Sequence, residues 1–366
     1  MSMSADYRRP PALGGASARP KKGARRPLQW ALTLLSLALL VVIIWRAAPA
    51  LEESSDALRR IAPGWFVAAM GLEIIALGAL AQVYRVALRA LGKNLSYPQA
   101  LDTSMGAFTV SRVVPGGGAV GAAFAARRLT HFGTSGAVAT ATVLLASTTL
   151  MVTLAVVVAL AAVVLWATGT LAVVWLVLLA SPTLLVVLTV VGARLLWRSP
   201  PRRAQLQAFA QRVARRLHID LDAWRVPVER LTRESHGLRR LAPVVAWSAI
   251  NWLTDAAALW MVFLGLGQQL KVSILLVGYG AANIATAIPI TPGGLGVVEA
   301  GTAGAFAALG VPAAPAVVAV IGYRVMSYWL PVAAGVAPYL RAVRAEKRRA
   351  AVVPEEGHQP SGRPVS

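Results

Sequence analysis

Residues 288–301 read IPITPGGLGVVEAG, and they place two prolines and four glycines inside an apolar region. Proline has no amide hydrogen and glycine adopts positive φ without steric cost, so a helix entering this stretch must break. A new helix is expected to begin between residues 294 and 296, with its amide hydrogens and positive dipole end facing the break. Such a helix end inside a membrane suits a phosphate or another anion. A plain turn between tightly packed helices is the alternative interpretation.

The composition around this stretch indicates a membrane protein. Of the 366 residues, 57% are hydrophobic and 14% are charged, and the charged residues gather in a few stretches. These values exclude an ordinary cytosolic enzyme and a disordered or nucleic-acid-binding chain. There is no cysteine, which excludes disulfides and thiolate sites, and the four histidines have no ligand spacing. We therefore expect neither a metal nor a cofactor.

Long uncharged runs predict transmembrane helices. The first run, 28–45, would form a helix about 27 Å long, enough to cross the hydrocarbon core. Its basic flank is also typical of a cleaved signal peptide, but its length and the spans that follow favour an uncleaved helix. Segments 101–114, 118–132 and 294–309 are short and should be re-entrant or surrounded by protein. The other predicted spans are 63–82, 136–167, 171–196, 241–266, 272–290 and 312–340.

Basic residues orient these spans. They dominate a disordered tail at 1–27, an insertion at 198–240 and a polar tail at 341–366, whereas residues 51–60 form an acidic loop. By the positive-inside rule, both termini and the insertion are cytoplasmic in the inner (plasma) membrane, and the acidic loop is outside. The positive charge can also bind anionic headgroups, so it does not require a nucleic acid partner.

The insertion contains one segment with helical periodicity. Apolar residues recur at helical spacing across 205–217 with arginines beside them, which predicts an amphipathic helix on the inner membrane surface. A short soluble linker helix is the alternative.

The chain contains an internal repeat. A shift of 177 residues places Pro115-Gly116-Gly117 on Pro292-Gly293-Gly294, and nine of 26 positions from 115 to 140 are then identical. Both copies also have the same order of turn, short helix, glycine and long helix. This shared order is stronger evidence for a repeat than the identities are. The repeat halves, about 63–167 and 240–340, begin on opposite sides of the membrane. We therefore expect an all-α polytopic membrane protein within 28–340, with about eight transmembrane helices plus short broken or re-entrant helices in an inverted repeat.

Three charged residues inside apolar stretches are candidates for a substrate path. Glu299 and Arg324 are isolated intramembrane ions, so each should face a partner or a wet cavity. One interpretation is that they pair or line the path together, and the alternative is a structural ion pair that joins two helices. Arg112 lies three residues before Pro115-Gly116-Gly117, the first proline–glycine corner, and could contact a phosphate. The alternative is an arginine whose charged end extends to the membrane interface. The two proline–glycine corners complete this set with Pro115, Gly116, Gly117, Pro292, Gly293, Gly294 and Gly296.

Two further acids are predicted to be buried. Asp255 follows Asn251 by one helical turn on the same face, and Glu73 lies in the predicted span 63–82. Either acid could hold a proton or a cation. Hydrogen bonds between packed helices would explain both acids equally well.

The second corner and its surroundings resemble a known family. Pro292-Gly293-Gly294-Leu295-Gly296-Val297-Val298-Glu299, followed by Gly310-Val311-Pro312 and Tyr323-Arg324, is similar to the lysylphosphatidylglycerol synthase transmembrane region, also called the flippase-like domain family. The resemblance covers about 28–340. It implies a membrane domain that, in two-domain members such as the multiple peptide resistance factors, moves aminoacylated phospholipid across the bilayer while a soluble domain makes the lipid.

Two departures limit what this resemblance implies. The residues after 340 are too few for an aminoacyltransferase domain, so we expect no synthase activity. The first copy has no acid across 119–123, and Ser147 stands at the repeat position of Arg324. A mechanism that needs the same charges in both halves is therefore not expected.

The expected function is transport of an anionic phospholipid or a lipid-linked intermediate by a membrane protein that is not an enzyme, because no catalytic motif is present. The alternative is a non-transporting partner that scaffolds a membrane glycosyltransferase or a cell-envelope lipid synthase, with 198–240 as its docking surface.

Overall fold

The computed structural model describes residues 63–113, 117–170, 237–285 and 297–352, which are helical apart from short connections. The predicted spans 28–45 and 171–196, and residues 198–236 of the insertion, lie outside the described residues. The helices are α3 (Pro63–Ala90), α4 (Tyr97–Val113), α5 (Gly117–His131), α6 (Gly136–Ala167), α10 (Gly237–Gly265), α11 (Val272–Ala285), α12 (Val297–Ala308), α13 (Ala313–Arg324), the π-helical turn η2 (Val325–Trp329) and α14 (Leu330–Val352).

Three described helical segments are long and apolar enough to cross a membrane: Gly64–Ala90, Gly136–Ala167 and Ala313–Arg344. They correspond to three predicted spans, although α3 continues past residue 82 to Ala90. The predicted span 241–266 falls on α10, which has 29 residues but is not among these three segments. The predicted span 272–290 falls on α11, which has 14 residues, and residues 286–290 lie outside the described part of the chain. Helix α14 continues to Val352, so the predicted polar tail begins as helix.

The outward faces of the long helices are apolar. Ile74 on α3 is 64% exposed, as is Leu160 on α6, and Leu144 is 54% exposed. Helix α6 has no polar face, because valine, leucine and alanine surround it, and a helix that is apolar on all sides belongs in a protein core or in lipid. The exposed faces of α3 and α6 are therefore suited to lipid tails.

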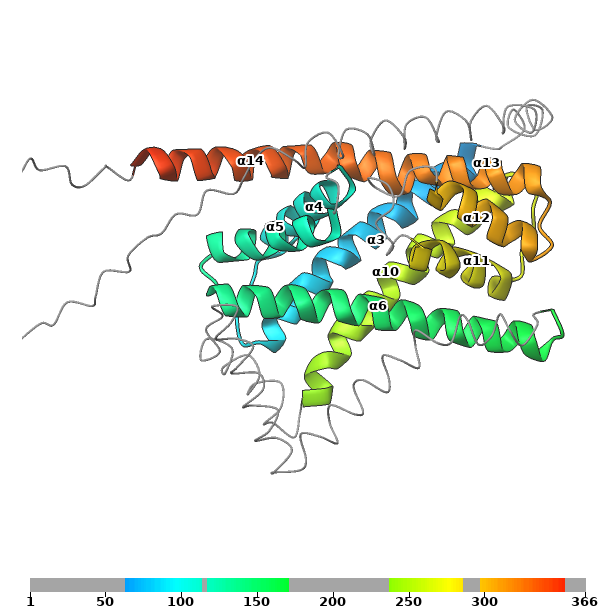
Figure 1. The fold of residues 1–366 in the computed structure, drawn as a ribbon, viewed down its shortest axis with the longest axis horizontal. Coiled ribbons are helices and arrows are strands. Elements are labelled where there is room, and N and C mark those ends of the chain that lie inside the picture. Colours follow the sequence, from blue (N-terminus) through cyan, green and yellow to red (C-terminus); the bar gives the residue numbers. More distant parts are fainter. Residues whose placement is uncertain (1–62, 114–116, 171–236, 286–296, 353–366) are drawn as a thin grey trace, which may run out of the picture.

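Two helices cross the centre of the molecule. Helices α3 and α10 run in opposite directions and pack along much of their length, while α6 and α14 lie on opposite sides of them (Figure 1). The Asn251 amide on α10 donates a hydrogen bond of 2.8 Å to the Ala76 carbonyl oxygen on α3. The Trp252 indole donates one of 2.8 Å to the Leu150 carbonyl oxygen on α6. These hydrogen bonds fix the position of α10 relative to α3 and α6.

Short helices fill the space on each side of the crossing. Helix α4 packs against α5 and α14, and α11 packs against α12 and α6. In both pairs of short helices a phenylalanine ring lies over a glycine. A Cβ at Gly106 would lie 2.5 Å from the Phe124 ring, and a Cβ at Gly278 would lie 2.5 Å from the Phe306 ring. Glycine thus allows close helix contact at both places.

The second short helix of each pair ends in the same way. Gly133 follows α5 with φ of 86°, and Gly310 follows α12 with φ of 85°. The next amide in each case donates back across the last turn, from Thr134 to the Leu129 carbonyl and from Val311 to the Phe306 carbonyl. A left-handed residue is needed in this type of helix end, and glycine adopts that conformation without strain.

Candidate functional site

A cavity of about 300 Å³ lies beside the central crossing. Its walls come from α3, α4, α6, α10, α11, α12, α13 and η2, so residues far apart in the sequence meet there. Several charged side chains line it, although the helices around it are mostly apolar. Ionised groups are expensive in such surroundings unless they are paired or face a wet cavity. This cavity is therefore the candidate site.

Asp255 on α10 is the centre of the polar wall. Its carboxylate accepts a hydrogen bond of 2.6 Å from the Tyr279 hydroxyl on α11 and another from the Tyr323 hydroxyl on α13. Three helices are thereby joined through one carboxyl group. Hydrogen bonds to an ionised group are stronger than those between neutral groups, so they also fix the orientation of the carboxylate.

Glu73 on α3 adds a second acid to the same end of the cavity. Only 5% of the residue is exposed, and its carboxyl group interacts with that of Asp255. One of its carboxyl oxygens has no hydrogen-bond partner within the described segments. An unsatisfied buried oxygen is costly, so this position favours a bound proton or a positively charged group.

Glu299 and Arg324 form the predicted ion pair. The Arg324 Nε donates to the Glu299 Oε1 over 2.7 Å, and the two side chains are only 10% and 8% exposed. Glu299 lies in the first turn of α12, where the positive end of the helix dipole stabilises its charge. Pairing was one of the arrangements that the sequence left open, and the structure has it.

Arg112 brings a second guanidinium group to the positive end of the cavity. Its central carbon lies 4.8 Å from the centre of the Phe108 ring and 5.5 Å from that of Tyr328. Arg324 lies 4.8 Å from the same Tyr328 ring, so one aromatic ring contacts both arginines. The Tyr328 hydroxyl donates to the Arg112 carbonyl oxygen over 3.1 Å. These contacts keep two like charges close together.

The lining of the cavity thus contains two groups of charged side chains, which we call its acidic end and its basic end. Glu73 and Asp255, whose carboxyl groups interact, form the first, and Arg112 and Arg324, which contact the same Tyr328 ring, form the second. A phosphate fits the basic end and an amine or a proton fits the acidic end. No cluster of metal-ligating side chains occurs within the described ranges.

The other candidates from the sequence have different positions. Asn251 lines the cavity, and its amide donates a hydrogen bond to the Ala76 carbonyl oxygen of α3. Gly117 begins α5, where a Cβ would lie 1.8 Å from the Ser111 carbonyl oxygen. The remaining corner residues lie outside the described residues: Pro115, Gly116, Pro292, Gly293, Gly294 and Gly296.

Sequence reasoning missed the three tyrosines. Tyr279, Tyr323 and Tyr328 are partly or largely buried in helices that are otherwise apolar. A buried tyrosine hydroxyl usually has a hydrogen-bond partner. That rule could have linked them to the site, but it could not have identified Asp255 as the shared acceptor.

We expect Tyr323→Phe to destabilise the folded protein by about 1–2 kcal/mol, because it removes one hydrogen bond from a carboxylate within the membrane domain. The thermal unfolding midpoint in detergent measures this. Tyr339→Phe is the matched control: Tyr339 is 40% exposed and its ring contact with Phe124 would remain. Equal midpoints for the two variants would contradict the assigned role of Tyr323.

Apolar helices that enclose a charged cavity define this chain as a multi-pass membrane protein. It belongs to the family described as the lysylphosphatidylglycerol synthase TM region, which matches residues 33–335.

Curated relatives share shorter segments. A UPF0104 membrane protein of Methanothermobacter thermautotrophicus is 29% identical over 104 residues, which cover 28% of this chain and 31% of the relative. The UPF0104 membrane protein PH1989 of Pyrococcus horikoshii is 34% identical over 98 residues, which cover 26% of this chain and 29% of the relative. The chain thus matches about a third of the length of each of these relatives.

Proposed function

We propose that this protein is a flippase-like transporter that moves an anionic phospholipid or a lipid-linked intermediate across the inner (plasma) membrane. The observation that carries the proposal is the two-ended cavity, which helices from both parts of the chain enclose. A polar cavity among apolar helices offers a headgroup a path that avoids the hydrocarbon core, while the acyl chains stay in lipid.

The basic end of the cavity supports binding of a phosphate. Arg112 and Arg324 lie on two elements that approach the Tyr328 ring, and planar guanidinium groups bind phosphate through paired hydrogen bonds. The acidic end, formed by Glu73 and Asp255, would take an amino group or a proton carried with the lipid. The family description names lysylphosphatidylglycerol, a lipid that has both a phosphate and amino groups.

The packing of the helices supports an inverted repeat as the transport scaffold. Helices α3 and α10 run in opposite directions (Figure 1), and the contact of α4 with α14 is matched by that of α11 with α6. Gly133 and Gly310, which are 177 residues apart, have nearly the same φ. Inverted repeats often place a substrate site where the halves meet. On this proposal both termini are cytoplasmic, as the basic tails predict.

We expect Glu299→Gln to slow lipid translocation at least about tenfold, the cost of weakening one charge-assisted hydrogen bond. Glutamine keeps an oxygen for the Arg324 Nε but leaves the guanidinium charge uncompensated, so the thermal unfolding midpoint is measured beside the rate and translocation is compared at equal amounts of folded protein. The measurement uses proteoliposomes with fluorescent phosphatidylglycerol and quenches the label in the outer leaflet. Arg112→Gln should show a similar loss. Arg89→Gln, which changes an exposed side chain in the last turn of α3, should not.

Two outcomes would contradict different parts of the proposal. A wild-type protein that moves neither phosphatidylglycerol nor aminoacylated phosphatidylglycerol would contradict lipid transport. Wild-type rates in Glu299→Gln and Arg112→Gln would instead remove both residues from the path.

A further inference from the structure

The acidic end of the candidate site contains a buried oxygen that the described contacts leave unsatisfied. Glu73 is 5% exposed, and its Oε2 has no hydrogen-bond partner within the described helices. Its carboxyl group also interacts with that of Asp255, across the contact between α3 and α10. Two ionised carboxylates at one site repel each other, and burial strengthens the repulsion. One of these two carboxyl groups is therefore expected to carry a proton.

The hydrogen bonds around the two acids indicate which of them carries it. Asp255 accepts from the hydroxyl groups of Tyr279 and Tyr323, one on each of its carboxylate oxygens. Donors on both oxygens stabilise the ionised form of Asp255. The Oε2 of Glu73 has no such donor, whereas a protonated carboxyl group has a hydrogen of its own to donate. The proton thus belongs on Glu73.

Each element packed against α3 contributes to the surroundings of Glu73. Helix α10 provides Asp255, and α4 provides Arg112, whose guanidinium group interacts with Glu73. Helix α6 adds only apolar residues to the lining, and η2 adds Ser327. The remaining titratable residues of the lining are Tyr279, Tyr323 and Arg324. Arg112 is therefore the cation through which the acidic end senses the basic end.

An anion bound at Arg112 changes the charge that Glu73 experiences. The guanidinium group attracts an ionised Glu73, whereas a phosphate beside it would cancel the attraction and add a repulsion. Binding of the phosphate therefore favours the protonated form of Glu73. By thermodynamic linkage, protonation of Glu73 must raise the affinity for the phosphate by the same factor.

We propose that Glu73 is a proton-binding site coupled to the anionic headgroup, so that one proton enters the cavity with each lipid. This inference rests on the proposed function and adds its driving force, because a proton gradient would then move lipid in the direction of proton flow. A metal ion is a poorer occupant, since the described helices contain no cluster of three metal-ligating side chains. A lipid amino group would satisfy Oε2 only while that lipid is bound, whereas a proton is available throughout the transport cycle.

The first measurement detects the proton itself and requires no transport. Infrared spectra of the purified protein in detergent at neutral pH should contain the C=O stretching band of a buried, protonated carboxyl group. The band should shift in D₂O, and Glu73→Gln should remove it. A wild-type protein without this band, or a band that persists in Glu73→Gln, would overturn the assignment of the proton to Glu73.

The second measurement tests the coupling by calorimetric titration of the protein with a short-chain phosphatidylglycerol, from neutral to alkaline pH. The affinity should fall by up to about tenfold per pH unit as Glu73 loses its proton, which is the limit for one linked proton. Glu73→Gln cannot ionise at this position and should lose the pH dependence. His131→Gln is the control: it changes the histidine of the described ranges, which lines a different cavity, and should behave as the wild type.

The outcomes separate this inference from the proposed function. Equal pH dependence in the wild type and in Glu73→Gln would overturn the coupling, and an affinity that depends on sodium at constant pH would replace the proton with a metal ion. If Glu73→Gln does not fold, the wild-type infrared band must still disappear over the pH range in which the affinity falls. Phosphatidylglycerol that binds at no pH would instead contradict the proposed function, while the infrared band would still test the proton at Glu73.

Discussion

Replacing Arg324 with methionine is expected to lower the free energy of unfolding by about 3–5 kcal/mol, because it leaves Glu299 as an unpaired buried charge. Both side chains are about nine-tenths buried and are joined over 2.7 Å. Removing one partner keeps the desolvation cost of the other and loses the attraction between them. This variant should show one of the largest losses of thermal stability of any single change in the described helices.

The double variant Glu299→Met/Arg324→Met separates a structural role from a functional one. Buried ion pairs replaced by apolar side chains of similar size are often neutral or stabilising, so the double variant should recover most of the lost unfolding midpoint. Its lipid translocation should nevertheless stay at least about tenfold slower than that of the wild type. A double variant that is stable and still transports would show that the pair only holds α12 to α13.

Gly117→Ala is expected to cost about 3 kcal/mol or more, at the upper end of overpacking effects. The added Cβ would lie 1.8 Å from the Ser111 carbonyl oxygen, and backbone cannot move aside as a side chain can. Helix α5 must then shift away from the end of α4. Because Arg112 directly follows Ser111, lipid translocation should fall together with stability.

The adjacent glycine provides a matched control. A Cβ at Gly118 would meet no atom within 4 Å, and alanine favours helix over glycine by up to about 1 kcal/mol. Gly118→Ala should therefore unfold at the wild-type temperature or slightly above it. Similar unfolding midpoints for the two alanine variants would show that α4 and α5 do not approach each other as the structure has them.

Much of the helical architecture could be predicted from local patterns. The span 136–167 matches α6, because a long uncharged run with no helix breaker leaves few alternatives. The short helices α5 and α12 begin near the proline–glycine corners for the same local reason. Helix ends were less predictable. Helix α3 continues to Ala90 because its last turns are buried by packing, which hydropathy does not report.

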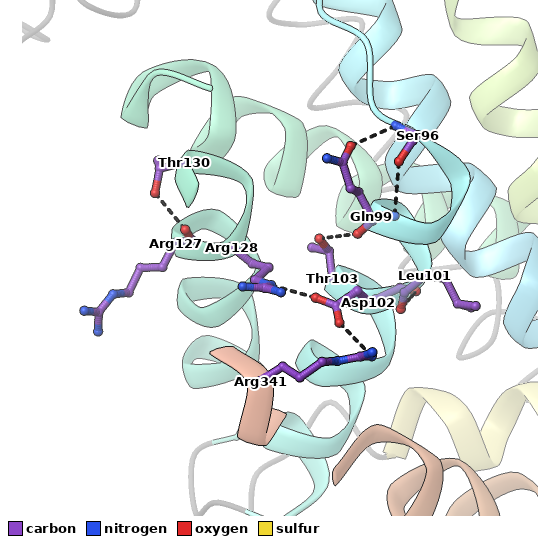
Figure 2. A network of polar contacts seen from close by, with 10 residues as sticks. Ser96, Gln99, Leu101, Asp102, Thr103, Arg127, Arg128, Thr130 and Arg341 are labelled. Carbon is purple, nitrogen blue, oxygen red and sulfur yellow. Dashed lines mark hydrogen bonds and ion pairs between the residues drawn. The ribbon is translucent and has the colours of Figure 1, made fainter. Parts of the chain in front are cut away.

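The candidate site could be predicted only in part. Isolated charges in apolar runs pointed to Glu299 and Arg324, since such ions require a partner. Which partner each would meet depends on how distant helices pack. Asp255 contacts hydroxyl groups 24 and 68 residues further along the chain. Asp102 of α4 pairs with Arg128 of α5 at 2.6 Å and with Arg341 of α14 at 3.0 Å (Figure 2). It was not singled out from the sequence, because a polar helix end gives no sign that one carboxylate will join three helices.

Helix α4 forms a common wall between the candidate site and a second cavity of about 770 Å³, which lies along α4, α5 and α14. Phe108 and Thr109 are neighbours in sequence, yet they line different cavities. A ligand in the second cavity that displaces α4 must therefore change the affinity of the candidate site for its own ligand. By thermodynamic linkage, a ligand in the candidate site must change the affinity of the second cavity by the same factor. The two cavities would then be thermodynamically linked, so that filling one changes how readily the other is filled.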